Sequence, residues 1–283
     1  MSSSKKAQIE ISFNWIFVLI AGAAILFFFI NVIGGTLDEE ERGSHRRAVS
    51  RMNILITALQ QNPDSVRVED HIGYEIYFEC TAEGQAYGIK NSDARETLPH
   101  QIVFTPSAIG NSNIVTWVRT FKTPFPLSSV LYLTDKKTKY IFLEDFDTNN
   151  RIKHYYDLFP NNITKEMMTK QEFEQIRDED YREYIIIMSQ QLTSDSFTFQ
   201  DERNLRGKIR NFIVIDETNN QIQFHELPQG MNVLDTNYIE KSYITEEAVI
   251  GAIISGTPEL YKCTMNKVLE QIRIITDIHL KRL

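Results

Sequence analysis

The longest apolar stretch of the chain lies near its N-terminus and runs from Ile11 to Ile33 without a charged side chain. Its 23 residues would span roughly 34 Å as an α-helix, because each helical residue advances the chain by about 1.5 Å. The hydrocarbon core of a bilayer is about 30 Å thick, so this length suits one crossing. The pattern predicts a transmembrane helix at residues 11–33, preceded by a cytoplasmic N-terminus of residues 1–10.

The charges that flank this run set the expected orientation. Lys5 and Lys6 precede it, whereas the acidic residues 38–41 follow it. Basic residues resist translocation, so we expect the N-terminus inside and residues 34–283 outside the cell membrane. The opposite topology stays open, because Arg46 lies within about 15–20 residues of the far end of the run.

The same run differs from a cleaved secretory signal. Such signals have an apolar core of about 7–15 residues, followed by a cleavage site between small residues. The run at residues 11–33 is longer, and no clear site of that kind follows it. We therefore expect the helix to be retained as a signal-anchor.

After the run, the spacing of apolar residues predicts that the helix continues as a stalk over residues 34–62. Apolar residues recur there at steps of three and four, which places them on one side of a helix. These residues are Val49, Met52, Ile56 and Leu59. The seam can pair with a second copy or pack on the chain's own body. We favour the body, because the seam is short for a coiled coil.

Residues 63–283 form the predicted body. The first part, residues 63–127, has β-branched and aromatic segments between turn residues, which predicts strands. One hairpin is expected around the turn at residues 82–85. The second part, residues 128–283, mixes apolar runs with helical spacing.

The second part contains the pattern that decides the fold class. Two apolar runs flank a polar turn at residues 135–138, and helical spacing follows at residues 149–159 and 164–178. A nearly continuous apolar run at residues 184–188 is typical of a strand buried on both faces. Strand, helices and strand predict a crossover between parallel strands. The predicted fold class is α/β, a mixed sheet with helices, and α+β is the alternative. Later, Thr245 is expected to cap a helix.

Charge and histidine spacing exclude some functions. The chain has 38 acidic and 30 basic residues and a formal net charge of −8. A broad nucleic-acid surface needs clustered positive charge, so we expect no nucleic-acid partner. The histidines lack metal-ligand spacing, and no phosphate-binding or dinucleotide-binding glycine motif is present. We therefore expect no metal and no cofactor.

The chain has two cysteines, Cys80 and Cys263. In a body outside the cell they face an oxidising space and can form a disulfide between the first strand region and the last helix. The alternative is two buried free thiols, which behave as small hydrophobic side chains. The sequence leaves both open, because it does not give the distance between them.

Two further patterns are candidates for chemistry or modification. Asp145-Phe146-Asp147-Thr148 resembles the D-x-D-x-T motif of haloacid-dehalogenase-type phosphatases, in which the first Asp attacks phosphorus beside Mg²⁺. Because no later acidic pair completes such a metal site, a solvated acidic loop is the interpretation that we favour. Asn162 begins the triplet Asn-Ile-Thr, which is an acceptor pattern for glycosylation.

The segment before the apolar run carries one resemblance. Lys5-Lys6-Ala7-Gln8, followed by Glu10 and a long apolar helix, resembles the class III signals of archaeal type IV pilin-like proteins. In that family a peptidase cuts just before the apolar helix, which then packs in a filament core. The resemblance implies a cut between Ala7 and Gln8. Glu10 lies closer to that cut than the family's acidic residue does, and any inside-positive anchor also explains the lysines.

Strings along the body carry a second resemblance. Residues 75–89, 100–109, 115–143 and 251–272 are similar to segments of uncharacterised, N-terminally membrane-anchored proteins of small-genome archaea. The likeness runs from the anchor to the last helix. It implies an archaeal membrane or surface setting and assigns no catalytic residue.

The sequence therefore predicts a single-pass, membrane-anchored cell-surface protein with a structural or interaction role. Its expected partners are the membrane and other proteins. The roles that fit this prediction are a component of an envelope complex or of a pilin-like filament. The alternative is a membrane-tethered, phosphatase-like hydrolase that uses Asp145 and Asp147.

Overall fold

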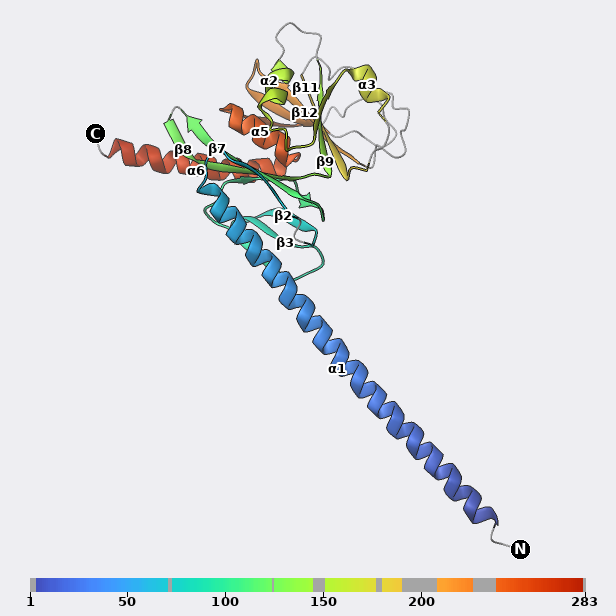
Figure 1. Ribbon diagram of the computed structural model, residues 1–283. Coiled ribbons are helices and arrows are strands. Elements are labelled where there is room, and N and C mark those ends of the chain that lie inside the picture. The colour runs from blue at the N-terminus through green and yellow to red at the C-terminus, as the bar shows by residue number, and fades with distance from the viewer. Residues whose placement is uncertain are drawn as a thin grey trace. The chain divides into compact units, whose positions relative to one another are not determined.

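In the computed structural model, the described residues are 4–70, 73–123, 125–144, 151–176, 180–189, 208–225 and 238–281 (Figure 1). The chain divides into two compact units, residues 1–47 and residues 48–283, and each is described by itself. All the strands belong to the second unit.

A single helix, α1 (Ser4–Gln60), accounts for the described part of the first unit and continues into the second. Within the apolar run, the side chains of residue 15 and residues 18–29 are described. Their large apolar members are all exposed: Trp15, Val18, Leu19, Ile20, Ile25, Leu26, Phe27, Phe28 and Phe29. Among the described residues, no helix combines the length and the hydropathy that a membrane crossing requires.

The last turns of α1 belong to the second unit and pack by one side on its core. The buried residues of this side include Val49, Met52, Ile56 and Leu59. They join a hydrophobic cluster with strand residues, which confirms that the seam packs on the chain's own body. The Tyr87 hydroxyl also donates to the Val49 carbonyl oxygen at 3.1 Å. The helix ends at Gln60, shortly before Pro63, because proline disfavours helical backbone in the residue that precedes it.

Two four-stranded sheets hold the strands of the β-rich part. Sheet A has the order β1-β7-β8-β5, formed by β1 (Val66–Glu69), β7 (Ile114–Thr123), β8 (Phe125–Asp135) and β5 (Val103–Phe104). Sheet B has the order β4-β3-β2-β6, formed by β4 (Arg95–Leu98), β3 (Gly84–Ile89), β2 (Ile76–Thr81) and β6 (Ala108–Ile109). The β2–β3 pair is the predicted hairpin, with Thr81 opposite Gly84 at its turn.

Sheet C has six strands in the order β10-β9-β11-β12-β13-β14. They are β9 (Thr138–Leu143), β10 (Lys165–Met168), β11 (Glu183–Ser189), β12 (Ile209–Asp216), β13 (Gln221–His225) and β14 (Ile239–Ser242). The first four in the order are parallel, and β13 and β14 pair antiparallel. The body is thus a mixed α/β fold, as the sequence predicts, and β11 is buried on both faces.

The predicted helix at residues 164–178 is wrong in its first half. Residues Lys165–Met168 form β10, which pairs parallel with β9, and the helix α3 (Lys170–Glu174) begins only after Thr169. Thr169 and Glu172 form a capping box there, which fixes the start of the helix. The predicted crossover runs from β9 to the parallel strand β11, and it contains the helix α2 (Arg151–Leu158), β10 and α3.

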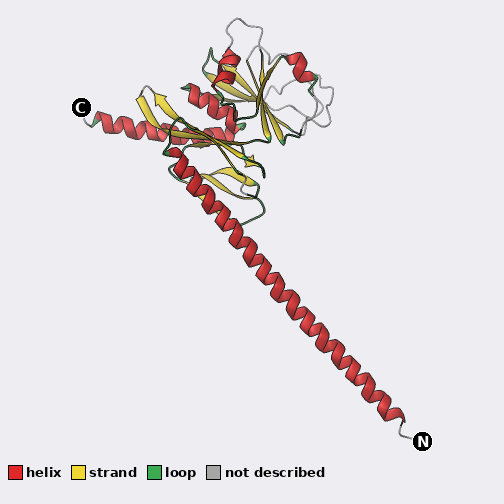
Figure 2. Cartoon of the chain, viewed as in Figure 1, coloured by secondary structure: helices red, strands yellow, loops and turns green. Residues whose placement is uncertain are grey.

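Two helices close the chain, α5 (Glu246–Ser255) and α6 (Pro258–Leu280). Thr245 caps α5, as predicted, by accepting a hydrogen bond from the Ala248 amide. Nearly every residue of α5 is buried, because its core cluster includes strands of both sheet A and sheet C. A Cβ atom on Gly251 would lie 2.6 Å from the Phe104 ring, so only glycine allows this close approach to sheet A. Figure 2 shows the helices and strands of this region together.

A disulfide joins α6 to sheet B. Cys80, on β2, and Cys263, on α6, are bonded, with 5.9 Å between their Cα atoms and a sequence separation of 183. Of the two possibilities that the sequence leaves open, the structure has the pair and not two free thiols. Cys80 is exposed and Cys263 is buried, so the bond lies at the edge of the core.

The three sheets meet at one buried carboxylate, Asp135, the last residue of β8. The amide of Gly110, directly after β6, donates to its Oδ2 atom at 2.7 Å. The Lys137 amide and the Thr138 hydroxyl donate to its Oδ1 atom at 3.0 and 2.9 Å. Sheet A supplies the carboxylate, and the donors come from the end of sheet B and the start of sheet C.

A second buried carboxylate, Glu183, joins this network from the start of β11. Its Oε1 atom lies 3.0 Å from the Thr138 hydroxyl and 2.7 Å from the Arg182 guanidinium. The same guanidinium nitrogen lies 3.2 Å from the Oδ2 atom of Asp135. Arg182 therefore supplies positive charge to both carboxylates, which would otherwise be too costly to bury.

We expect Asp135→Ala to lower the free energy of unfolding by about 3–5 kcal/mol, because it removes the acceptor of the Gly110 and Lys137 amides and one of the two buried carboxylates that pair with Arg182. Asp180→Ala is the matched control. Asp180 pairs with Lys137 at 2.5 Å, but its side chain is fully exposed, so its loss should have little effect. Urea unfolding, followed by fluorescence of the buried Trp117, measures both. Equal losses in the two variants would contradict the role given to Asp135.

Candidate functional site

The best candidate site is a cavity of about 660 Å³ beside the carboxyl end of β12, which we name the α2–α5 pocket. Its lining comes from three elements: Arg151, His154 and Tyr155 from α2, Glu217 and Asn220 from the β12–β13 turn, and Tyr243 and Glu246 from the start of α5. Ligands of open α/β sheets bind outside the carboxyl ends of the strands, and this pocket has that position. Figure 1 shows α2 and α5 near β12.

Local backbone structure holds the turn that carries Glu217 and Asn220. Asp216, at the end of β12, accepts hydrogen bonds from the amide and the side chain of Asn219, at 3.2 and 2.7 Å. Asn220 adopts a left-handed backbone conformation, φ 52°, which asparagine tolerates well. The Tyr243 amide donates to the Asn220 carbonyl oxygen at 3.0 Å, which ties the turn to the segment before α5.

Both carboxylates of the pocket have a partner within it. Arg151 forms an ion pair with Glu217, joining α2 to the turn. His154 Nε2 lies 2.9 Å from an oxygen of Glu246, joining α2 to α5. Each carboxylate still has unused oxygen lone pairs.

Two tyrosine hydroxyls meet in the pocket. Tyr155 is buried, Tyr243 is half-buried, and their side chains share a hydrogen bond. Burial raises the pKa of Tyr155, and the neighbouring Tyr243, Glu217 and Glu246 raise it further. Burial also raises the pKa of Tyr243, with Glu217 as the next cause. Both phenols are therefore neutral at physiological pH, and a neutral hydroxyl both donates and accepts hydrogen bonds.

The pocket offers hydrogen bonds rather than a reactive group. Its groups are neutral hydroxyls, a side-chain amide, an imidazole, the carboxylate of Glu246 and the ion pair of Arg151 with Glu217, and none is an activated nucleophile of the serine or cysteine kind. Within the part of the chain that the structure describes, no three candidate ligands are grouped as a metal ion would need.

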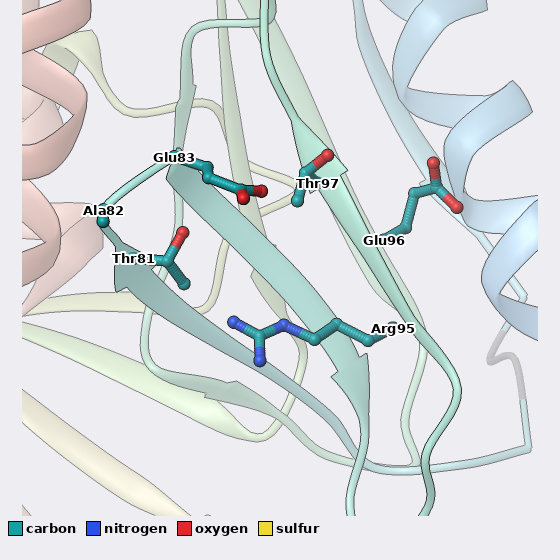
Figure 3. Close-up of a pocket in the computed structure, with 6 residues that line it drawn as sticks. All are labelled: Thr81, Ala82, Glu83, Arg95, Glu96 and Thr97. Atoms are coloured by element: carbon teal, nitrogen blue, oxygen red, sulfur yellow. The ribbon is translucent and has the colours of Figure 1, made fainter.

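Two other cavities are less suited to a ligand. One, of about 500 Å³, lies on sheet B, and Figure 3 shows Glu83 directed toward Thr97 while Glu96 points away from them. Its Arg95 is already paired with Glu79 at 2.5 Å. The other, of about 580 Å³, lies next to the Asp135 network and includes Lys137, which is bound to Asp180.

Among the described residues, the structure brings together one pair of the site residues predicted from the sequence, Cys80 and Cys263. Asn162 lies exposed in the turn after α2, a position that a glycan can reach, and its modification stays a prediction. The backbone of the processing segment, Lys5 to Gln8, is part of α1, and the structure does not describe the side chains of this segment.

Asp145 and Asp147 also lie outside the described residues. They follow β9, a parallel strand with β10 on one side and β11 on the other. The phosphatase-like hypothesis therefore stays a prediction.

Sequence reasoning missed the α2–α5 pocket. Residues Asp216 to Asn220 have the composition of a turn, and Thr245 predicts a helix cap, but neither pattern distinguishes Glu217 or Glu246 from other surface carboxylates. Nothing local connects either with Arg151, because the three elements meet only through the sheet.

Comparison of the chain with protein-family models, with curated proteins and with solved structures gives no match.

We expect the free energy of unfolding to fall as the pH rises above about 10, the pKa of an unfolded tyrosine. The folded chain holds the Tyr155 proton more tightly than the unfolded chain, so this stabilisation is complete below that pH and is lost above it. Tyr155→Phe should flatten the decline by about 1.4 kcal/mol per pH unit. Urea unfolding at several alkaline pH values measures the slope of the free energy of unfolding against pH for the parent chain and the variant.

The matched control is Tyr238→Phe, which changes an exposed tyrosine outside the pocket. Its pH dependence should match that of the parent chain. If the free energy of unfolding falls as steeply with pH in Tyr155→Phe as in Tyr238→Phe, the claim that burial raises the pKa of Tyr155 is wrong.

Proposed function

We propose that the chain is a single-pass membrane protein of the cell surface, with a cytoplasmic N-terminus and an extracytoplasmic body that acts in structure or interaction. The observation that carries the proposal is the apolar surface of α1. Nine large apolar side chains between Trp15 and Phe29 are exposed along this helix. Removing each from water is worth roughly 1.5–3 kcal/mol, so hydrocarbon is a far better solvent for this segment than water.

The sequence of the segment supports a crossing rather than burial in a protein core. No charged residue lies between Ile11 and Ile33, and the apolar side chains point in all directions around the helix. A helix that is hydrophobic on every side is typical of a membrane span or of the centre of a large protein. The described residues of this segment have no such core around them, since their side chains are exposed.

The disulfide supports the proposal that the body lies on the extracytoplasmic side of the membrane. Disulfides such as Cys80–Cys263 persist in extracytoplasmic spaces and are rare in the reducing cytosol. Lys5 and Lys6 before the run favour the same orientation.

The surface of α6 supports an interaction role. In its second half four large apolar side chains are exposed: Leu269, Ile274, Ile278 and Leu280. Apolar surface of this kind is common where proteins meet other proteins. An envelope or filament complex would supply such neighbours, and the pilin-like variant adds removal of residues 1–7.

The anchor is tested by placing charge in its apolar surface. Leu19→Arg combined with Leu26→Arg should move the chain from the membrane pellet to the supernatant during alkaline carbonate extraction. Each arginine costs about 2.5–3.5 kcal/mol at the centre of a membrane helix. Ile54→Arg is the matched control, because Ile54 is an exposed apolar residue of the same helix outside the run.

The control should stay in the pellet as the parent chain does. Parent chain found in the supernatant would refute the anchor. So would a double variant that stays in the pellet as firmly as the parent.

A further inference from the structure

We propose that the α2–α5 pocket binds a neutral carbohydrate, one or two sugar units in size. The inference rests on the proposed function in one respect only, that the body lies outside the cell and meets the ligand there. The binding itself follows from which contacts the pocket already makes, which hydrogen bonds it leaves open, and how its backbone is held.

The contacts already made within the pocket disfavour a charged ligand. A ligand carboxylate or phosphate that took Arg151 from Glu217 would break one ion pair to make another. A ligand ammonium that approached Glu246 would have to displace the ring of His154, which already lies 2.9 Å from its carboxylate. A sugar hydroxyl breaks nothing, because it can donate to a free lone pair of Glu217 and accept from a free N–H of Arg151 at the same time.

The remaining polar groups suit hydroxyls as well. The hydroxyls of Tyr155 and Tyr243 are neutral, so each can donate or accept. Asn220 is exposed at the rim, and its amide has a donor and an acceptor side by side. A sugar presents alternating hydroxyls that need this mixture of donors and acceptors.

One aromatic face completes the match. Tyr243 is half-buried, so part of its ring faces the cavity that it lines, whereas the ring of Tyr155 is almost fully buried. Sugars have a C–H face as well as hydroxyl edges, and that face packs on an aromatic ring. The cavity of about 660 Å³ has room for this arrangement.

The pocket is also organised before any ligand arrives. Arg151, His154 and Tyr155 lie on one helix, and the turn opposite is held by Asp216 and by the Tyr243 amide. Backbone that is already ordered loses little conformational entropy on binding, which matters for a weakly bound neutral ligand.

The experiment measures binding of D-glucose, D-mannose, D-galactose and N-acetyl-D-glucosamine to the full chain by saturation-transfer NMR and titration. The detergent must lack a sugar headgroup, since maltosides and glucosides would compete. At least one of these sugars should bind. Glu217→Gln should weaken binding about tenfold, because hydrogen bonds to a charged group are the stronger ones.

Two tyrosine variants separate the pocket from the rest of the surface. Tyr243→Phe keeps the ring and removes one hydroxyl, so binding should weaken several-fold and persist. Tyr238→Phe makes the same change at an exposed tyrosine outside the pocket and should leave binding unchanged. Unchanged thermal unfolding of each variant shows that the fold is intact.

Three outcomes would overturn the inference. The first is that none of the four sugars binds. The second is that Glu217→Gln and Tyr243→Phe bind as the parent chain does. The third is that inorganic phosphate or glycine displaces the sugar from the pocket. None of these outcomes bears on the anchor, because the protein is already in detergent, and a failed carbonate extraction test would leave the sugar result standing.

Discussion

Asp135 is a carboxylate with no exposed surface, at the point where sheets A, B and C meet. Its backbone donors come from Gly110 and Lys137, and its counter-charge comes from Arg182. A buried charge is tolerated only where such partners compensate it. The position of each sheet is therefore linked to the positions of the other two through a single side chain. The start of β9 and the start of β11 are fixed by the same network.

Beyond this junction, hydrophobic packing and the disulfide join the three sheets to the helices. Sheet A and sheet C share a core with α5 between them, and the close approach at Gly251 requires that α5 has no bulky side chain there. Sheet B packs on the last turns of α1 and is joined to α6 by the disulfide. The α2–α5 pocket lies beside the carboxyl end of β12, a strand inside sheet C, where the turn after β12 meets two helices.

Local patterns were enough for most of the elements. The β2–β3 hairpin, the buried strand β11 and the cap at Thr245 were predicted from turn residues, an apolar run and a capping residue. Strand β10 was missed, because methionines favour helices and the pairing of residues 165–168 with β9 is not a local property.

The sites show the same limit. Asp135 was predicted to lie in a polar turn, and its distant partners Gly110 and Arg182 explain why it is buried. The α2–α5 pocket was not predicted for a similar reason, since Arg151 and Glu217 are brought together by the sheet. For Cys80 and Cys263 the sequence left both a disulfide and two free thiols open, because a separation of 183 residues says nothing about the distance between the two side chains.

The central functional claim is that the body lies outside the cell, and non-reducing peptide mapping of the protein from native membranes tests it most directly. Thiols are blocked at lysis, so that no bond forms afterwards. The account predicts one linked peptide that contains Cys80 and Cys263, and no alkylated form of either. Both cysteines recovered as alkylated free thiols would place the body in a reducing compartment and contradict the account.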